Sequence, residues 1–405
     1  MITVAIIAEY NPFHTGHEYQ IKRIREEFGN DTRIIAIMSG NYTQRGDVAI
    51  MDKSTRAKSA VLCGVNLVLE LPFPYSMSSA EFFAKSGVKI ADSIGVVDYL
   101  SFGSERGDID SLITVAKNMS TDKYKSALSC ALKSKISKES GYPKLCEEVY
   151  NSLFPSSDNV FTFTPNNILA LEYIKALLNI KSKIKPHTIK RVGASFSETK
   201  ITADRFQSAS AIRTNIFDNF NSASKYIPNI AVMTLVESYE SGQFPCDSEK
   251  LSAAIISTFR LNPQPLCSDI HDAGGGLYNR LQKASLEAND IHTLTVLADT
   301  KKYTAARIRR AIWYSFFGVT SSSVKELPAY TQILAMDKVG KTILKEIKKV
   351  TDFSVITKPS SYAFLSDTAR CQKILADKAD SVFQLTKPKQ PSGNLALKTT
   401  PYILK

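Results

Sequence analysis

The residue types best suited to chemistry lie near the N-terminus, in the segment His14-Thr15-Gly16-His17. An apolar run precedes this segment and a helical pattern follows it, so it should open a helix directly after a strand. Histidines three positions apart lie on one face of a first turn, where free backbone N–H groups favour phosphate. Gly16 lacks the side chain that would keep a nucleotide away from the backbone. We therefore predict that His14 and His17 are catalytic and stabilise a transferring phosphoryl group; two polar histidines without a catalytic role are the alternative.

Four short apolar runs predict the sheet that would position this segment. They cover residues 2–8, 33–38, 65–71 and 97–102, and helical patterns or capping signals lie between them. Repeated alternation of strand and helix favours a parallel sheet covered by helices. Ligands bind such sheets beyond the carboxyl ends of the strands, so the segments after Ala8, Met38, Leu71 and Phe102 should line one site.

Helical patterns dominate the rest of the chain. Residues 108–164 predict a polar helical excursion, followed by a helix over 166–178, a strand over 185–192 and a helix from 208. Basic helices are expected over 303–317 and 330–350, and a draped or loose tail over 387–405. We thus predict an α/β fold: a Rossmann-like parallel-sheet catalytic domain over 1–220, then a mostly α-helical domain over 221–405.

The charge balance makes a polyanionic partner plausible, although a merely basic enzyme would share it. The formal net charge is +12 and the isoelectric point is about 9.2. One predicted helical region carries aromatic residues among cations, and a second is rich in lysine: Lys301, Lys302, Tyr303, Arg307, Arg309, Arg310 and Trp313, then Lys338, Lys341, Lys345, Lys348 and Lys349. Cations contact phosphates and exposed aromatics stack on unpaired RNA bases. A solvated basic helix face is the simpler interpretation.

Cysteine usage and hydropathy argue against several other classes. Six scattered cysteines form no CxxC pair, so neither a zinc site nor a disulfide framework is indicated. We expect a reduced, cytoplasmic compartment. The apolar N-terminus is short, lacks a basic leader and does not resemble a signal peptide. No stretch approaches the ~20 apolar residues that span a bilayer.

The histidine segment resembles the HxGH nucleotidyltransferase superfamily, whose Rossmann-like fold is shared with class I aminoacyl-tRNA synthetases. Members usually carry a second motif like Ile-Ser-Ser-Thr-x-x-Arg, which opens a late helix and holds the β and γ phosphates. Residues Ser208, Ser210 and Arg213 match it loosely and are candidates for a phosphate loop, but Ala209 and Ala211 replace hydroxyl residues. A plain capped helix start is the alternative.

Further motifs are similar to those of the bacterial tRNA(Met) cytidine acetate ligases. They extend over nearly the whole chain: residues 8–17, 38–47, 52–56, 69–72, 79–81, 102–105, 165–169, 188–191, 300–304 and 307–310. The resemblance implies that ATP activates acetate as acetyl-adenylate and that Mg²⁺ accompanies the nucleotide. The acetyl group then passes to the wobble cytidine of elongator tRNA(Met).

The same resemblance implies a set of ATP contacts: Ile7, Ala8, Glu9, Tyr10, Asn11, Pro12, Phe13, His14, Thr15, Gly16, His17, Glu18, Tyr19, Gln20, Gly103, Asn166, Arg191 and Val192. Gly103 would let adenine or ribose approach, Asn166 could read a base or sugar edge, and Arg191 could bind phosphate or stack on adenine. A helix cap at Asn166 and a surface arginine at Arg191 are the alternatives.

Two further groups are candidate contacts for acetate or tRNA. Gln44, Arg45, Asp52, Lys53 and Arg56 follow the second predicted strand, although a salt-bridged structural loop would use the same residue types. The other group is Lys301, Lys302, Tyr303, Arg307, Arg309 and Arg310. Two other functions stay open on the sequence alone: an adenylyltransferase acting on a phosphorylated metabolite, and a non-catalytic tRNA-binding protein that holds ATP structurally.

Overall fold

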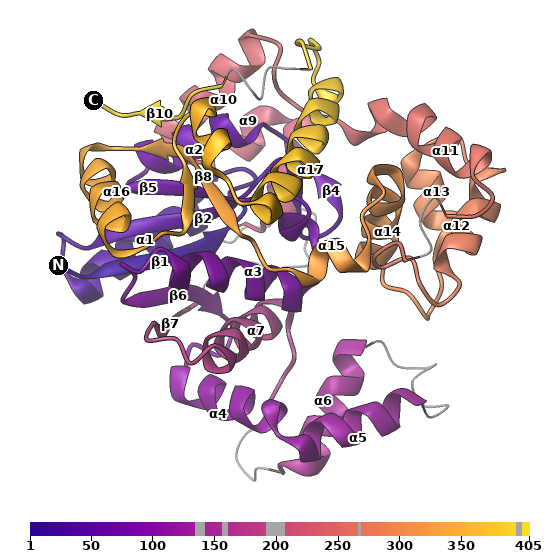
Figure 1. Ribbon diagram of the computed structural model, residues 1–405, viewed down its shortest axis with the longest axis horizontal. Helices are drawn as coiled ribbons and strands as arrows, with labels where there is room; N and C mark the ends of the chain where they lie inside the picture. The colour runs from indigo at the N-terminus through magenta and orange to yellow at the C-terminus, as the bar shows by residue number, and fades with distance from the viewer. Residues whose placement is uncertain (134–141, 156–160, 192–206, 266–268, 394–398) are drawn as a thin grey trace.

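A single mixed sheet organises the molecule. The computed structural model describes residues 1–133, 142–155, 161–191, 207–265, 269–393 and 399–405. Five parallel strands form the centre of the sheet: β1 (Thr3–Ala8), β2 (Arg33–Ser39), β5 (Leu67–Leu71), β6 (Tyr99–Ser104) and β7 (Lys185–Lys190). The strand order is β10-β8-β5-β2-β1-β6-β7, with β9 paired to β8 (Figure 1). The predicted strands of the first 190 residues are confirmed.

Helices cover both faces of this sheet, as the alternation of strand and helix predicted. In β1, Val4 and Ile6 pack with Ile21 and Ile24 of α1 (Thr15–Phe28); α2 (Lys53–Leu62) lies on the same side. Ala5, the intervening residue, faces the core formed with α3 (Ala80–Ser93) and α7 (Pro165–Asn179). Successive side chains of a strand point to opposite faces, so both faces are buried. The Rossmann-like α/β class is therefore confirmed.

The C-terminal part of the chain returns to the sheet, which the sequence pattern did not predict. Residues Tyr330–Met336 form strand β8, antiparallel to β5, and only Lys338–Val350 forms a helix, α16. The prediction of one basic helix over 330–350 was therefore wrong in its first part. The strand is buried almost throughout, and a short continuous apolar run cannot be distinguished from a buried helix by periodicity.

The far edge of β8 is covered by two short strands. Strand β9 (Ser354–Ile356) pairs with its first half and β10 (Tyr402–Ile403) with its second half, both parallel to β8. Lys387 is only 2% exposed and forms an ion pair with Asp52. The expectation of a loose tail over 387–405 was thus wrong for both ends of that segment, since its ends are anchored by a buried charge and by strand pairing.

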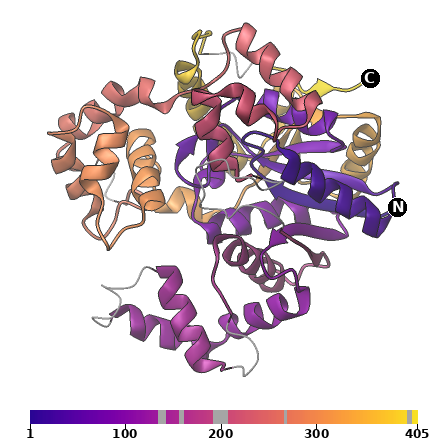
Figure 2. The same ribbon diagram turned by 180° about the vertical axis from the view of Figure 1, so that it is seen from behind.

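The remaining helices form two groups beside the sheet. Helices α4 (Ile109–Ser120), α5 (Asp122–Lys133) and α6 (Tyr142–Leu153) extend from one side, and the helices around α14 (Ala305–Phe317) form a second group on another side (Figures 1 and 2). The latter part of the chain contains α8 (Ala209–Asp218), α9 (Phe220–Ser224), α10 (Asn229–Glu240), α11 (Ser252–Leu261), α12 (Leu277–Ser285), α13 (Ile291–Ala298), α14 (Ala305–Phe317), α15 (Ser321–Lys325) and α17 (Asp367–Phe383). The minor elements are β3 (Tyr42–Thr43), β4 (Asp47–Val48), η1 (Tyr75–Met77), η3 (Ser248–Leu251), η4 (Pro359–Phe364) and η5 (Gln384–Thr386). Across the described ranges, no helix has the length and apolar character that crossing a membrane requires.

Candidate nucleotide-binding site

The segment between β1 and α1 is held rigidly beyond the carboxyl end of β1. Tyr10 adopts a left-handed conformation with φ of 47°, and Asn11 accepts a hydrogen bond from the Ile50 N–H through Oδ1 at 2.9 Å. The buried rings of Tyr10 and Phe13 pack against His17, with centroids 4.8 and 5.4 Å away. The two apolar rings therefore fix the orientation of the second histidine.

The two histidines use one ring nitrogen each to build the start of α1. His14 Nδ1 accepts from the Gly16 N–H at 3.1 Å, and His17 Nδ1 accepts from the His14 N–H at 3.2 Å. The two rings stack with centroids 3.7 Å apart. A neutral imidazole that accepts at Nδ1 carries its proton at Nε2. Both rings thus have an Nε2–H that the helix start does not use.

The surroundings keep both imidazoles neutral. Burial, followed by the charges of Arg191 and Arg213, lowers the pKa of His14 to about 3. Burial, His14 and Arg191 lower the pKa of His17 well below its usual value. Two neutral hydrogen-bond donors can approach phosphate oxygens without gaining or losing a proton at ordinary pH.

The role of Gly16 differs in part from the sequence-based interpretation. A Cβ at this position would lie 2.9 Å from His14 Cε1 and 3.0 Å from His14 Nδ1. The glycine therefore makes room for the His14 ring itself, in addition to any room that it leaves for a nucleotide.

Arginines surround the histidine pair. Arg213, on α8, donates to the Asn11 carbonyl at 2.9 Å and to Ser210 Oγ at 3.2 Å, and burial lowers its pKa. Ser208 caps α8 by accepting from the Ala211 N–H at 3.0 Å. The structure thus brings the loose Ser208–Arg213 motif to the histidine segment, with Ser208 engaged as a helix cap. Burial also lowers the pKa of Arg191, whose charge acts on both histidines.

The loop after β6 lies next to Arg191. A Cβ on Gly103 would lie 3.2 Å from Arg191 Cγ, so this glycine is packed by the arginine stem. Asn166 donates to Glu105 Oε1 at 2.5 Å. Glu105 Oε2 accepts from the Asn167 N–H and the Thr164 hydroxyl. In return, Asn167 Oδ1 accepts from the backbone N–H groups of residues 105 and 106. The sequence-based site omitted Glu105 and Asn167, which brace this loop; both belong to motifs that the sequence had made visible.

The other predicted ATP contacts are placed as follows. Thr15 donates its N–H to the Tyr226 carbonyl at 2.9 Å, and its hydroxyl is buried without a partner among the described residues. Gln20 donates to the Ser101 carbonyl at 3.3 Å. Ile7, Ala8 and Pro12 belong to β1 and the turn after it, whereas Glu18 and Tyr19 lie on the first turns of α1. Val192 lies outside the described residues.

Some residues of the segment after β2 lie near the histidines, and others are buried in the interior of the protein. Glu9 Oε1 accepts from the Gln44 N–H at 2.8 Å. Arg45 is partly buried, and the charges of Glu9, Arg213 and Arg309 act on it. Arg56 is 0% exposed and donates to the carbonyls of Glu9, Gly40 and Met51. Arg56 therefore has a structural position, not one from which it could contact RNA.

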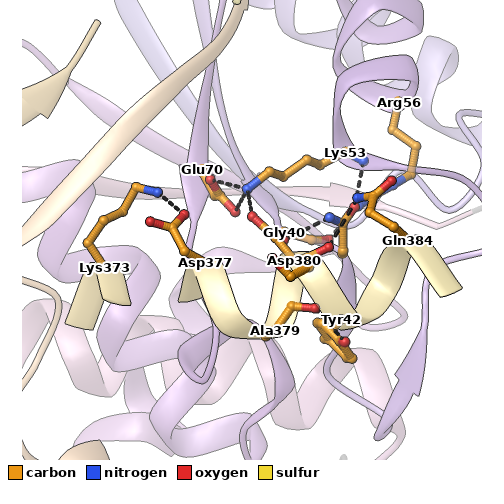
Figure 3. A network of polar contacts seen from close by, with 12 residues as sticks. Gly40, Tyr42, Lys53, Arg56, Glu70, Lys373, Asp377, Ala379, Asp380 and Gln384 are labelled. Atoms are coloured by element: carbon orange, nitrogen blue, oxygen red, sulfur yellow. Dashed lines mark hydrogen bonds and ion pairs between the residues drawn. The ribbon is translucent and has the colours of Figure 1, made fainter. Parts of the chain in front are cut away.

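Lys53 and Asp52 are also engaged inside the protein. Lys53 Nζ bonds both oxygens of Glu70, at 2.7 and 2.9 Å, and Asp380 Oδ2 at 2.5 Å (Figure 3). Burial lowers the pKa of Lys53, but the charges of Asp380 and Glu70 outweigh burial and raise this pKa above its usual value. Asp52 caps α2 and pairs with Lys387 at 3.1 Å. The alternative of a salt-bridged structural loop describes these two residues better than contact with a substrate.

Helix α14 lies against the loop that contains Arg45. Arg309 Nε donates to the Arg45 carbonyl at 3.1 Å. A Cβ on Gly46 would lie 2.7 Å from the backbone nitrogen of Arg310. Arg310 is buried and pairs with Asp272 at 2.6 Å. Lys301 and Lys302 are exposed and Arg307 is half-buried. The basic helix is thus adjacent to the histidine site, but its cations differ in how far they are exposed to solvent.

The expectation that aromatic rings of the basic helix stack on bases was wrong, whereas phosphate contacts from the lysines of α16 stay a prediction. Tyr303 and Trp313 are 7% and 1% exposed, so neither ring can stack on a base; each belongs to the core of the helical group. The lysines of α16 lie at the other end of the parallel strands, away from the histidine site. There, Asp337 accepts from Asn66 before β5, and Glu346 pairs with Arg33 at the start of β2. Because β8 is antiparallel to its neighbour, the helix after it begins where the parallel strands begin.

Known proteins share both the sequence and the fold. The HIGH Nucleotidyl Transferase family model matches residues 1–395. Proteins named tRNA(Met) cytidine acetate ligase from Thermoanaerobacter sp. and Acetivibrio thermocellus are 39% and 34% identical, each over 92% of both chains. The crystal structure of Thermotoga maritima TmcAL bound with alpha-thio ATP is 30% identical and covers both chains completely, with a TM-score of 0.89. The apo form of that protein gives a TM-score of 0.91. This chain therefore belongs to the HIGH nucleotidyl transferase family, in the group that includes the proteins named tRNA(Met) cytidine acetate ligase.

Proposed function

We propose that this protein activates acetate with ATP and then acetylates the wobble cytidine of elongator tRNA(Met). The observation that carries the proposal is the stacked His14–His17 pair, whose Nε2–H donors have no hydrogen-bond partner among the described residues. It occurs in a chain similar to proteins named tRNA(Met) cytidine acetate ligase. A tRNA substrate makes this a cytoplasmic enzyme.

The first step would be nucleotidyl transfer to a carboxylate. An acetate oxygen attacks the α-phosphorus of ATP, diphosphate leaves and acetyl-adenylate forms. Acetate is already anionic at neutral pH, so no protein base is needed in this step. His14 and His17 would donate Nε2–H to phosphate oxygens as negative charge moves toward the leaving group, while Arg191 and Arg213 balance that charge.

A magnesium ion would reach this site on the triphosphate. Mg²⁺ commonly keeps several waters and binds through substrate phosphates with one or two carboxylates. Among the described residues, no three histidine, cysteine or acidic side chains are grouped as a metal site. This arrangement suits a metal carried by the nucleotide better than one held in a cage of protein ligands.

The second step would need RNA beside the histidine site. Helix α14 supports this, because Arg309 and Arg310 contact the loop at Gln44 and Arg45 while Lys301 and Lys302 remain exposed nearby. Exposed cations bind backbone phosphate without reading sequence. We infer that this side of the molecule receives the anticodon stem and loop.

One reaction tests the proposed function. The protein is incubated with ATP and acetate, with and without elongator tRNA(Met), and diphosphate, acetyl-adenylate and acetylcytidine are measured. Acetylcytidine that requires all three substrates supports the proposal. Turnover of a phosphorylated metabolite in its place, or tRNA binding without any turnover, would overturn it.

His17→Ala tests the assigned role of the histidine pair. Loss of a positioned donor to the transition state should reduce acetate-dependent ATP–diphosphate exchange by about 10²–10³-fold. Binding of tRNA, measured by filter retention, should stay close to wild type because His17 lies within the nucleotide segment. Exchange at the wild-type rate would contradict the assignment.

A further inference from the structure

A carboxylate occupies a site that is otherwise suited to anions. Glu9 directly follows β1 and precedes the histidine segment. Its charge acts on Arg45, Arg56 and Arg213, where it opposes the lowering of their pKa values by burial. ATP and acetate are both negatively charged, and a neighbouring carboxylate repels each of them. The Glu9 carboxylate therefore balances part of the arginine charge and gains nothing from direct contact with either anion.

The carboxylate of Glu9 is only partly engaged. Its Oε1 accepts from the Gln44 N–H at 2.8 Å, which directs the group toward the loop after β2. Across the described residues, Oε2 has neither a hydrogen bond nor an ion pair. The side chain is partly exposed. One oxygen is thus held by the fold while the other can accept a hydrogen bond from a ligand.

We propose, on the basis of the proposed function, that Glu9 receives the exocyclic amine of the acceptor cytidine. Cytosine brings an exocyclic amine, and a carboxylate is the side chain that accepts from cytosine N4. The adenine of ATP also carries an exocyclic amine, but Glu9 lies beside Arg213 of the candidate phosphate loop, where the phosphates and not the base are expected. Uracil presents an oxygen at the same position, which a carboxylate repels. Glu9 therefore selects cytidine over uridine as well as positioning the amine.

The same interaction serves the acetyl transfer. The N4 lone pair attacks the carbonyl carbon of acetyl-adenylate, and the N4 proton passes to Glu9 Oε2. The new C–N bond forms, the bond between the acetyl carbon and the phosphate oxygen breaks, and AMP leaves with that electron pair. Glu9 then loses its proton to solvent. A positioned base of this kind typically contributes about 10²–10⁴-fold to rate.

Glu9→Gln tests the role in transfer. The amide keeps an oxygen for the Gln44 N–H but cannot take a proton. Acetylation of tRNA supplied with synthetic acetyl-adenylate should fall by about 100-fold or more, and acetate-dependent ATP–diphosphate exchange should fall far less. Glu26→Gln is the matched control, because Glu26 lies on the exposed face of α1 in ion pairs with Lys22 and Arg23; both reactions should be unchanged there.

A second measurement separates recognition from mere structural support. Wild-type protein should bind elongator tRNA(Met) more tightly than the same tRNA with a wobble uridine, and Glu9→Gln should lose this preference because an amide can donate to the uracil oxygen. An equal loss of exchange and transfer would overturn the proposal, and so would unchanged transfer with unchanged base preference. Failure of the proposed function itself is distinguishable, since wild-type protein would then form no acetylcytidine.

Discussion

At the scale of single residues, each histidine of the pair uses one ring nitrogen to stabilise the fold and leaves the other for a ligand. Each Nδ1 accepts a backbone N–H from the start of α1, and each Nε2 remains as a donor. The tautomer is thereby set by the helix start, before any nucleotide binds. Such preorganised donors need no rearrangement when charge develops in the transition state.

Gly16→Ala should damage catalysis more than stability. The added Cβ would lie 2.9 Å from His14 Cε1, so the imidazole must turn away from the position that the capping bond now holds. We expect adenylation to fall by about 10-fold or more, since small displacements of catalytic groups cost rate steeply, while urea unfolding changes by about 1 kcal/mol or less. Wild-type exchange in a well-folded Gly16→Ala protein would show that the ring position is not critical.

The lowered pKa of His14 has a consequence for stability against pH. The unfolded chain protonates this residue near pH 6.5, whereas the folded chain resists protonation until about pH 3. Protons therefore bind preferentially to the unfolded chain in this window, and stability falls as pH falls below 6.5. Between pH 7 and pH 5 the contribution of His14 should decrease by about 2 kcal/mol.

His14→Asn provides the comparison for this pH effect. Asparagine keeps an N-cap acceptor but does not titrate, so its free energy of unfolding, measured in urea at pH 7 and pH 5, should decline less than that of wild type. Equal declines in the two proteins would mean that His14 is protonated in the folded state.

At the scale of elements, a buried charge cluster joins the C-terminal helix α17 to the sheet. Lys53 at the start of α2 bonds Glu70 on β5 and Asp380 on α17, and Asn41 also donates to Asp380 (Figure 3). Burial raises the pKa of Glu70. Lys53 thus holds together two carboxylates that would otherwise repel each other in the interior.

Lys53→Met should destabilise the protein by about 3–5 kcal/mol, because it leaves buried charges without their partner. The loss is measured by urea unfolding at neutral pH. The triple variant Lys53→Met/Glu70→Gln/Asp380→Asn removes those charges as well and should recover a large part of the stability. If the single variant were as stable as wild type, the cluster would be solvated and of little structural consequence.

The sequence predicted the elements that local patterns determine. Strands β1, β2, β5 and β6 follow from continuous apolar runs. Strand β8 did not, because Tyr330–Met336 owes its conformation to pairing with β5, about 260 residues earlier in the chain. The histidine pair and Arg213 could also be predicted from the local sequence, because they belong to short motifs.

The residues that sequence reasoning misassigned are those whose roles depend on distant partners. Lys53 and Arg56 have the residue types of ligand contacts, but Asp380 and the backbone carbonyls around them occupy their charges. Trp313 has the residue type of a base-stacking platform, but it packs against Tyr42 and Phe317 in the helical group. Burial by elements far along the chain leaves no local signal.

At the scale of the whole molecule, the chain carries a net charge of +12, and exposed lysines lie at both ends of the parallel strands. Lys301 and Lys302 precede α14 on the side of the histidine site, whereas Lys341 and Lys345 lie on α16 at the other edge; all four are exposed. Of these two pairs, we expect the first to contact RNA whose cytidine reaches the site.

Lys301→Glu/Lys302→Glu should therefore weaken tRNA binding and reduce its salt dependence, by about one unit of slope for each phosphate that the protein no longer neutralises. Lys341→Glu/Lys345→Glu changes the net charge equally and should have a much smaller effect. Affinity is measured by filter binding over a series of salt concentrations. Equal reductions in affinity for the two variants would mean that overall charge, and not a defined surface, attracts the RNA.

The pairing of β8 has a consequence for how the protein is made. While the chain emerges from a ribosome, β5 stays an open strand edge until residue 336 is available, and the far side of β8 stays open until residues 356 and 403 arrive. Open edges are templates for pairing with other chains. An aggregation-prone edge of β5 thus stays open until β8 has been made, and covering the second half of β8 needs residues 402–403, which lie about 70 residues further along the chain.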